Sequence, residues 1–339
     1  MVKRQYRRRQ KQQQPSSQFW SQNAPRLTRV RVFGSAVVTG LMCTSLSFSH
    51  RSPHSSLEPI DSFLPVRKEQ TPPQAEQAQE PAAIEYNRTK YHYTPPSQSF
   101  GGPHSSCGVT DNNNPPTYES FFALDSRYRS RDKEDKIIWQ KFFASMGKRG
   151  TYVEMGAYNG MHETNSRFFD VCLGWKGLLI EANPVMFPEV PASRPQAHSM
   201  SFAPSCQQPD QTLEFHATLW TNAGVAGLAK AYEGEETVKV PCGPLQPVLE
   251  DIFAGGEAID FFSLDVEGAE PLVLETIDFT KVQIHVMLIE VANSFCKKED
   301  CEQRNHVREI MKKAGYQQYK GMVSGSDVFV HPNSPYQLA

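Results

Sequence analysis

Short apolar runs alternate with amphipathic stretches along the second two thirds of the chain. Four runs have the length and composition of buried strands, at 151–155, 177–180, 260–266 and 284–291. Segments typical of helices lie between or beside them, at 127–148, 163–173, 184–190, 269–276 and 302–314. Strands that alternate with helices predict a doubly wound α/β sheet.

Shorter apolar runs complete the expected sheet. A third strand is expected at 197–202, and 213–217 and 238–240 predict extra strands in an insertion. Gly315 is placed to end the last helix, and 316–320 and 327–331 then predict an antiparallel hairpin at one edge. In such sheets ligands bind at the carboxyl ends of the strands, where the strand order reverses.

The chain before residue 118 divides into three segments by composition, and the last of them has no apolar period. Residues 1–31 are basic and rich in Gln, 32–48 carry no charge, and 49–117 are rich in Pro, Gln and Ser. We therefore expect a basic tail, a candidate signal-anchor segment at 32–48, a disordered stem at 49–117 and a folded domain at 118–339. At ~1.5 Å per residue, the uncharged segment is at the short limit for crossing a bilayer.

The basic residues before the uncharged segment favour a cytoplasmic N-terminus. This predicts a type II protein with its domain in the lumen of the Golgi or elsewhere in the secretory pathway. A plastid or mitochondrial transit peptide is the main alternative, and a cleaved signal peptide or a buried helix are others. Asn87-Arg88-Thr89 is an N-glycosylation sequon that a lumenal stem would expose.

Charge and cysteine content narrow the function classes. Ten of the 35 Lys and Arg residues lie in 1–57, where there is no Asp or Glu, so the remaining 25 are set against 37 acidic residues. An acidic body argues against binding to nucleic acid. None of the seven Cys residues forms a C-x-x-C pair, which argues against a zinc ribbon. Outside Cys43, six Cys can pair in an oxidising compartment or remain buried thiols, and the two pairs we predict are Cys206–Cys242 and Cys296–Cys301.

Acidic residues and glycines follow the first two expected strands. The first strand leads into Glu154-Met-Gly156 and then Gly160, and glycine lets a backbone pass close to a ligand. The second strand ends at Glu181, 21 residues after Gly160. A carboxylate at that spacing is typical of a site that binds the two hydroxyls of a ribose.

Three carboxylates lie within six residues at the end of the 260–266 strand, at Asp265, Glu267 and Glu270. The next strand ends in Glu290. Crowded like charges raise one pKa or attract a cation. A carboxylate there could accept a substrate proton, hydrogen-bond a sulfonium-bearing amino acid or help to hold a metal. Glu270 is more typical of a first-turn acid favoured by the helix dipole. We assign no metal site.

Four segments carry a family resemblance: YVEMGAYNG, LGWKGLLIEANP, DFFSLDVEGAEPLVL and VMLIEVAN. Their order and spacing resemble those of the FkbM-type family of S-adenosylmethionine-dependent methyltransferases, over roughly residues 152–330. The resemblance implies a seven-stranded class I (Rossmann-like) methyltransferase fold, S-adenosyl-L-methionine as the cofactor, and methyl transfer to oxygen. The N-terminal layout is similar to that of Star-like eukaryotic relatives, which are discussed as cargo-handling proteins.

The resemblance also implies roles for individual residues. The methionine end of the cofactor would be bound by Glu154, Gly156, Asn159 and Gly160. Glu181 would bind the ribose, and the segment 198–201, including Ser201, would lie near the adenine. Asp265 and Glu267 would face the methyl-transfer centre, and Asp265 would also contact the cofactor. For the base that accepts a hydroxyl proton we choose Asp265, with Glu267 and Glu290 as alternates.

Three functions remain in competition. The first is a membrane-anchored O-methyltransferase that acts on a hydroxyl or carboxyl group of a small molecule or a glycan in the secretory pathway. The second is a non-catalytic trafficking or adaptor protein on the same fold, and the third is an organellar small-molecule methyltransferase. The sequence specifies neither the acceptor nor the oligomeric state.

Overall fold

The structure is a computed structural model that describes residues 86–99, 107, 118–228, 236–291, 296, 301–336 and 338. Within these ranges, no helix is both long and apolar enough to cross a membrane. The expected basic tail, the candidate anchor at 32–48 and most of the expected stem lie outside them.

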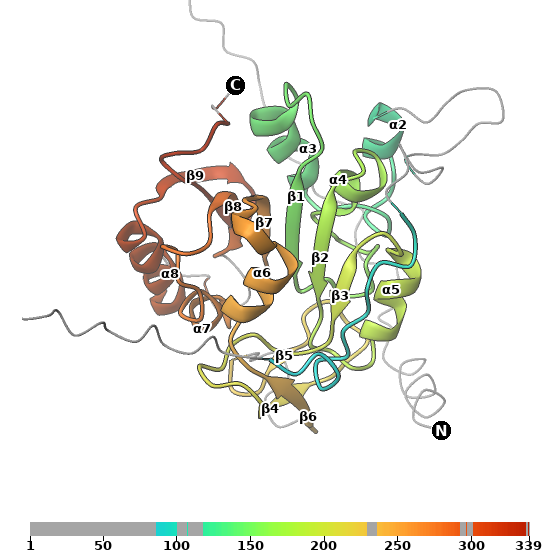
Figure 1. The fold of residues 1–339 in the computed structure, drawn as a ribbon, viewed down its shortest axis with the longest axis vertical. Helices are drawn as coiled ribbons and strands as arrows, with labels where there is room; N and C mark the ends of the chain where they lie inside the picture. The colour runs from blue at the N-terminus through green and yellow to red at the C-terminus, as the bar shows by residue number, and fades with distance from the viewer. Residues whose placement is uncertain are drawn as a thin grey trace, which may run out of the picture. The chain divides into compact units, whose positions relative to one another are not determined.

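A seven-stranded sheet forms the centre of the domain (Figure 1). Its strands are β1 (Thr151–Met155), β2 (Lys176–Ile180), β3 (His198–Met200), β7 (Ile259–Leu264), β8 (Ile284–Glu290), β9 (Gln317–Val323) and β10 (Ser326–Val330). They are ordered β3-β2-β1-β7-β8-β10-β9. The first five are parallel, while β10 is antiparallel to both β8 and β9. The predicted doubly wound sheet with a terminal antiparallel hairpin is confirmed.

The two faces of the sheet take alternate residues of each strand, because side chains in a strand point to opposite faces in turn. Val153 and Met155 belong to one hydrophobic cluster, and Tyr152 belongs to the other. Every residue of β1 and β7 is buried. Burial on both faces explains why these strands read as continuous apolar runs rather than as alternating ones.

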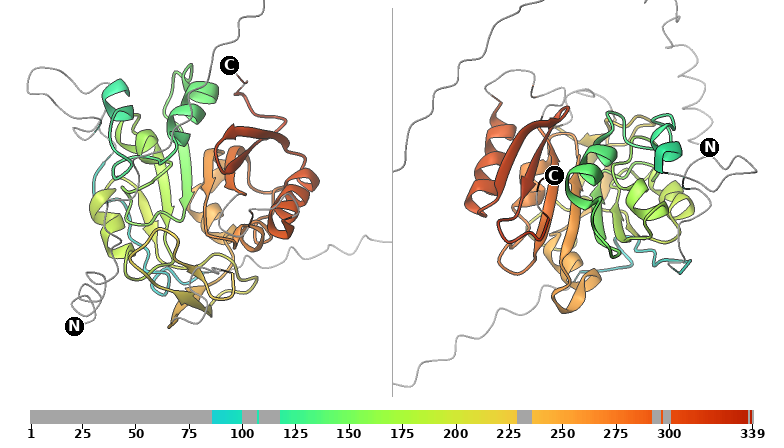
Figure 2. Two further views of the ribbon diagram at one scale, coloured as in Figure 1. Left: turned by 180° about the vertical axis from the view of Figure 1, so that it is seen from behind. Right: turned by 90° about the horizontal axis from the view of Figure 1, so that it is seen from above.

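Helices cover both faces. On one face lie α6 (Gln246–Ile252), α7 (Glu270–Leu274) and α8 (Glu302–Lys313). On the other lie α2 (Tyr118–Phe122), α3 (Glu134–Ile138) with the π-helical turn Trp139–Phe143, α4 (Arg167–Val171) and α5 (Val190–Ser193), which follows the 3-10 turn Phe187–Glu189. In the view from above, α8 in red and the teal and green helices lie on opposite sides of the strands (Figure 2).

Several helices differ from the sequence expectation. The helix expected over 127–148 covers only 134–143, and the one expected over 163–173 begins at Arg167. It begins late because Thr164, Asn165 and Ser166 instead hydrogen-bond the Glu154 carboxylate. Helix α6 was not predicted; its first turn contains Pro247, which a helix start tolerates.

A second sheet of three antiparallel strands, in the order β5-β4-β6, is inserted after β3. Its strands are β4 (Gln211–His216), β5 (Gly224–Val225) and β6 (Val238–Cys242). This insertion lies at the bottom of the view in Figure 1, at one end of the larger sheet. The two longer strands were predicted, and β5 was not.

Residues 86–99, which the sequence analysis places in the stem, pack on the domain. Thr94 pairs with Ser199 in an antiparallel bridge, with N–H···O distances of 2.8 and 3.0 Å. Tyr91 is fully buried in the larger hydrophobic cluster. This segment, drawn in cyan in Figure 1, therefore covers the edge of β3, and we call it the strap.

Three disulfides join described cysteines: Cys107–Cys172, Cys206–Cys242 and Cys296–Cys301. The last two are the predicted pairs. Cys206–Cys242 connects the chain after β3 to the end of β6, so it ties the insertion to the main sheet.

Candidate functional site

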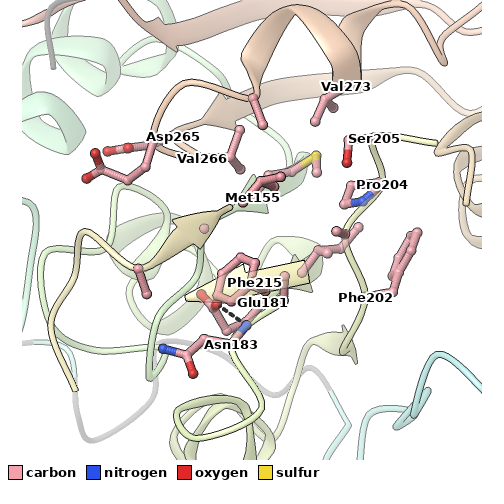
Figure 3. Close-up of a pocket in the computed structure, with 18 of the residues that line it drawn as sticks. Met155, Glu181, Asn183, Phe202, Pro204, Ser205, Phe215, Asp265, Val266 and Val273 are labelled. Atoms are coloured by element: carbon pink, nitrogen blue, oxygen red, sulfur yellow. Dashed lines mark hydrogen bonds between the residues drawn. The ribbon is translucent and has the colours of Figure 1, made fainter. Parts of the chain in front are cut away.

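A cavity opens at the carboxyl ends of β1, β2 and β7. The strand order reverses between β1 and β7, and this is where doubly wound sheets bind their ligands. Its lining combines polar groups at the strand ends with apolar side chains (Figure 3). Such a mixture is typical of a small-molecule site.

Gly156 lets two strand ends come together at this cavity. Its φ is +82°, and a Cβ added to it would lie 1.9 Å from the backbone oxygen of Asp265. Its N–H donates to the carbonyl of Ile180 over 3.0 Å. Only glycine fits this left-handed position, so the loop after β1 passes directly over the loop after β7.

Glu181 follows β2 and faces the same cavity. Its carboxylate accepts hydrogen bonds from the backbone N–H groups of Tyr158 (2.6 Å) and Asn183 (2.7 Å). Burial raises its pKa to about 7, and the negative charges of Glu154 and Asp265 act in the same direction. The carboxylate is thus fixed in orientation, while an ionised form with oxygen lone pairs for a ligand is available at neutral pH.

Apolar side chains form the opposite part of the cavity. Phe202 follows β3, and Phe215 and Val225 come from the insertion. Residues 202–205 line the cavity as a continuous segment, which we call the wall. The insertion holds the wall through a backbone hydrogen bond, which the N–H of Ala203 donates to the carbonyl of Pro241 (2.9 Å).

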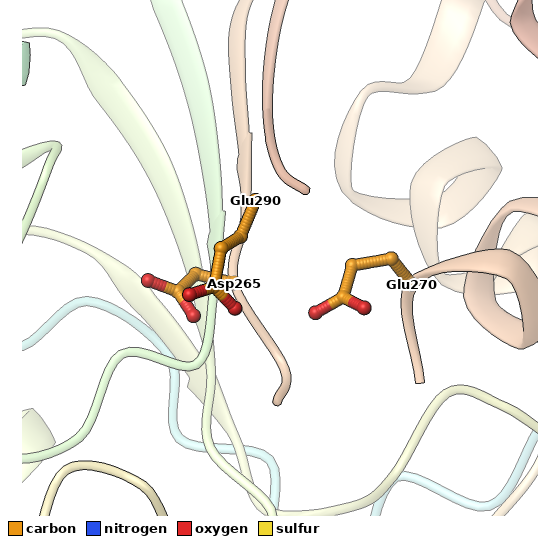
Figure 4. A group of neighbouring side chains, drawn as sticks. All are labelled: Asp265, Glu270 and Glu290. Atoms are coloured by element: carbon orange, nitrogen blue, oxygen red, sulfur yellow. The ribbon is translucent and has the colours of Figure 1, made fainter. Parts of the chain in front are cut away.

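Asp265 and Glu290 lie close together at the ends of β7 and β8 (Figure 4). Asp265 remains open to solvent on the cavity side, although protein atoms pack round its carboxylate. Burial is the largest cause of the raised pKa of both groups, and the charges of Asp265, Glu267 and Glu270 raise the pKa of Glu290 further, to about 11. Glu290 therefore holds the proton of the pair, and Asp265 holds the charge.

Two further carboxyl groups surround this pair. Glu270 begins α7 and accepts hydrogen bonds from the N–H groups of Val266 (3.0 Å) and Gly268 (3.2 Å). Burial raises its pKa to about 7, and burial with the charge of Asp265 raises the pKa of Glu267 to about 8. The expected first-turn role of Glu270 agrees with these contacts.

The same carboxylates are the cluster that could hold a cation. Single oxygens of Asp265, Glu270 and Glu290 lie within 4.8 Å of one another. Carboxylate oxygens are the ligands that Mg²⁺ and Ca²⁺ prefer. The raised pKa values of Glu270 and Glu290 mean that protons also favour this cluster, so a cation and protons would compete for it.

Four expected cofactor residues, Glu154, Asn159, Gly160 and Ser201, are not among the described residues that line the cavity. Glu154 is buried behind it, where it accepts bonds from Thr164 Oγ1 (2.6 Å) and Asn165 N–H (2.6 Å). The buried Arg194 lies 4.0 Å from the Glu154 carboxylate and also pairs with Asp170.

The other three also have structural contacts. Asn159 Oδ1 accepts from the N–H groups of Met161 (3.1 Å) and His162 (2.9 Å). Gly160 packs so closely that an added Cβ would lie 2.3 Å from Ser193 Oγ. Ser201 N–H donates to the carbonyl of Tyr91 over 2.7 Å. These residues shape the loops around the cavity.

Comparison with known proteins decides the family. Residues 154–317 match the family model described as Methyltransferase FkbM domain. This part of the chain is a methyltransferase FkbM domain. The expectation of a methyltransferase is thereby confirmed, and S-adenosylmethionine is the methyl donor of this class of enzyme. No curated protein matches the chain.

Solved structures resemble the FkbM domain only distantly. A TehB-like SAM-dependent methyltransferase from Corynebacterium glutamicum is 10% identical, with a TM-score of 0.33, over 61% of this chain and 87% of that one. A precorrin-6y C5,15-methyltransferase from Geobacter metallireducens is 8% identical, with a TM-score of 0.34, over 67% and 97%. An O-methyltransferase from Bacillus cereus, in complex with SAH, is 12% identical, with a TM-score of 0.34, over 61% and 84%.

Sequence reasoning missed three parts of the FkbM site. The backbone of Tyr158 holds Glu181, and its hydroxyl donates to the carbonyl of Leu219 over 2.6 Å. The wall begins at Phe202, directly after the segment 198–201 that was expected near the adenine. The insertion contributes Phe215 and Val225. The apolar run through Phe202 was the only sequence signal for the wall, because non-local packing rather than a motif places the insertion.

Proposed function

We propose that the FkbM domain transfers the methyl group of S-adenosylmethionine to a hydroxyl oxygen, with Asp265 as the proton acceptor. One observation carries this proposal: a single cavity is lined by the buried Glu181 carboxylate, by an apolar wall and by the ionised member of a carboxyl pair. The Glu181 carboxylate and the apolar wall fit an adenosine group, and the ionised carboxylate of Asp265 fits a proton acceptor.

The residues present fit the methyl donor. Glu181 offers acceptor oxygens to the ribose hydroxyls, and Phe202 and Phe215 offer apolar surface to the adenine ring. Gly156 lets the loop after β1 lie directly against the backbone of Asp265 at the edge of the cavity. When bound, S-adenosylmethionine supplies a methyl group already activated as a sulfonium. The chain must then align an acceptor oxygen and exclude water.

The charge around Asp265 supports a hydroxyl acceptor over a carboxyl acceptor. Glu267, Glu270 and Glu290 surround Asp265, and a substrate carboxylate would bring one more negative charge to this crowded place. A hydroxyl enters without charge and gives its proton to Asp265. Glu290, which hydrogen-bonds the Asp265 carboxylate, keeps this base oriented.

Donor binding is the first test. We would titrate the full chain with S-adenosylmethionine by calorimetry, beside the variants Glu181→Ala and Glu250→Ala. Glu250 is an exposed carboxylate on α6, outside the cavity lining, and serves as the matched control. Micromolar binding that is lost only in Glu181→Ala supports the donor site. A folded chain that binds no donor would instead favour a non-catalytic trafficking or adaptor protein.

Acceptor chemistry is the second test. Full chain and methyl-labelled donor would be incubated with panels of glycans and small alcohols and acids. A methyl ether survives mild alkali, whereas a methyl ester is hydrolysed, so alkali-stable label in the product supports hydroxyl methylation. Label released by alkali would overturn the hydroxyl assignment and support a carboxyl acceptor.

We further propose a type II membrane protein whose FkbM domain lies in the secretory pathway, with a glycan as the acceptor. The three disulfides favour an oxidising compartment. Asn87 of the sequon is exposed and opens a turn in which its Oδ1 accepts from Lys90 N–H (2.9 Å). A tagged full chain in eukaryotic cells should lose apparent mass with N-glycosidase, and Asn87→Gln should not. A processed, unglycosylated chain in plastids or mitochondria would support the organellar alternative.

A further inference from the structure

The strap, residues 86–99, contacts the wall of the proposed donor site through one aromatic ring. Tyr91 is fully buried, and its ring lies parallel to that of Phe202, with centroids 4.2 Å apart and planes 4° apart. Phe202 lines the cavity. The ring of Tyr91 therefore supports Phe202 from behind.

The Tyr91 hydroxyl reaches the insertion. It lies 3.5 Å from the carbonyl oxygen of Cys242 and accepts a weak bond from the N–H of Asp210 (3.4 Å). A Cβ on Gly243 would lie 1.9 Å from this hydroxyl, so the chain after β6 passes directly against it. Tyr91 thus joins the strap, the wall and the insertion at one point.

The remainder of the strap fixes Tyr91 in this position. The carbonyl of Tyr91 accepts from Ser201 N–H, and the Thr94–Ser199 bridge holds the strap along β3. At its beginning, Tyr86 and Arg88 both hydrogen-bond Asp251 at the end of α6. The ring of Tyr86 lies parallel to that of Tyr91 at 6.0 Å.

We propose that Tyr91 is a positioning residue of the methyl-donor site: the strap orders Phe202 and the wall against the adenosine part of the donor. This inference rests on the proposed donor site. Phe202 has cavity space on one side and the Tyr91 ring on the other, so without that ring its side chain would have a void to move into. The donor would then have to order the wall as it binds, which costs affinity.

The same strap offers a matched control in Tyr93. Its hydroxyl contacts His198 Nδ1 at 2.9 Å, and its ring lies under the Arg88 guanidinium at 4.7 Å, away from the cavity lining. Tyr91→Leu and Tyr93→Leu therefore make the same chemical change on one segment. Tyr91→Phe keeps the stacked ring and removes the hydroxyl.

The test measures calorimetric Kd values of the full chain for S-adenosylhomocysteine and for 5′-methylthioadenosine, which lacks the amino-acid part. We expect Tyr91→Leu to weaken both ligands by a similar factor of about ten, and Tyr91→Phe and Tyr93→Leu to change either by less than twofold. A purely structural role would lower the unfolding temperature of the free protein without this shared loss of affinity.

Two results would overturn the inference while the donor site stands. One is unchanged affinity in a folded Tyr91→Leu protein, and the other is an equal loss in Tyr91→Leu and Tyr93→Leu. Should Tyr91→Leu fail to fold, Phe202→Leu, which removes the other half of the stack, must show the same tenfold loss, and normal affinity there counts against the proposal. Absence of binding by the unsubstituted chain would overturn the donor site, and this inference with it.

Discussion

Asp265 and Glu290 are the residues at which the environment most changes the chemistry. Two carboxyl groups at neighbouring strand ends share a single negative charge, because burial and mutual repulsion keep Glu290 protonated. That division gives the site one charged acceptor and one hydrogen-bond donor. It also removes Glu290, one of the two alternates, from the choice of base at neutral pH.

Replacing Asp265 by Asn should therefore abolish proton transfer while leaving the fold intact. We expect turnover to fall by about 10²–10⁴-fold, the range for loss of a general base. The unfolding temperature should stay the same or rise, because the change removes a negative charge from a crowded cluster. Steady-state methyl transfer and thermal unfolding of the same preparation measure both.

Glu267→Gln is the matched variant for that experiment, since it removes the neighbouring carboxylate and keeps Asp265. We expect a smaller loss of turnover. Full activity and full donor affinity in Asp265→Asn, or a larger loss in Glu267→Gln, would move the role of base away from Asp265.

Glu181 makes donor binding dependent on pH. Its pKa is raised to about 7, and the ribose hydroxyls bind better to the carboxylate than to the neutral acid. At pH 6 about nine tenths of the free site is protonated, so the Kd for S-adenosylhomocysteine should be about tenfold weaker than at pH 8. Calorimetry at both values measures this, and Glu181→Gln should bind weakly with a flat profile. An equally flat profile for the unsubstituted chain would contradict the assigned role.

At the scale of elements, the contact between the loops after β1 and β7 depends on Gly156. Gly156→Ala forces a Cβ into the Asp265 carbonyl and also places alanine at φ +82°. We expect a loss of about 2–6 kcal/mol in the free energy of unfolding. Gly227→Ala is the control: φ is +84° there, but nothing lies within 4 Å, so the cost should be only about 1–3 kcal/mol. Denaturant unfolding of the two variants measures the difference, and equal losses would show that the close approach contributes nothing.

The disulfides differ in the length of chain that they close. Cys206–Cys242 spans 36 positions and Cys296–Cys301 spans 5. Because a longer loop loses more entropy when closed in the unfolded chain, removing the first bridge by paired Cys→Ala changes should cost about 4 kcal/mol, and removing the second about 2 kcal/mol. Chemical unfolding without reductant measures both. A larger loss from the short bridge would contradict this account.

The strands could be predicted from sequence because their signal is local. Thr151–Met155 was predicted with its exact ends, since apolar residues buried on both faces are flanked by turn residues. Helix α6 and the late start of α4 could not be predicted in this way. Helix α4 begins late because the residues before it hydrogen-bond Glu154, which is ten or more positions away in sequence. Helix α6 is stabilised by packing on the sheet.

At the scale of the whole molecule, motifs located the strand ends, while tertiary packing decided which side chains face the cavity. Glu181 and Asp265 were expected at the site and line it. Glu154 was expected there too, but β1 turns it toward Arg194 and the start of α4. The strap was not predicted, because the residues around Tyr91 are rich in Pro and Gln and have no apolar pattern. The ring that Tyr91 stacks on, Phe202, is more than a hundred residues away in sequence.

The cluster of raised carboxyl pKa values should also control the stability of the whole domain. Glu181, Glu267 and Glu270 have pKa values of about 7, 8 and 7 in the folded state, so above pH 6.5 they give up protons that the unfolded chain has already lost. The folded state binds more protons there, and the free energy of unfolding must therefore fall as pH rises from 6.5 to 8, by up to about 1.4 kcal/mol per pH unit for each such group. His198, His285 and His331, whose pKa values burial lowers, act in the opposite direction while the unfolded side chains still hold protons, and this contribution fades between pH 6.5 and 7.5.

Glu270→Gln keeps the acceptor for Val266 and Gly268 but cannot ionise, so it should reduce this slope, whereas the exposed Glu250→Gln should leave it unchanged. Denaturant unfolding at pH 6.5, 7.25 and 8, with EDTA in every sample so that no divalent cation replaces the protons, measures the three slopes. Stability that rises with pH across this window would mean that the carboxyl groups are ionised and paired in the folded chain. The division of charge between Asp265 and Glu290, on which the proposed base depends, would then have to be abandoned as well.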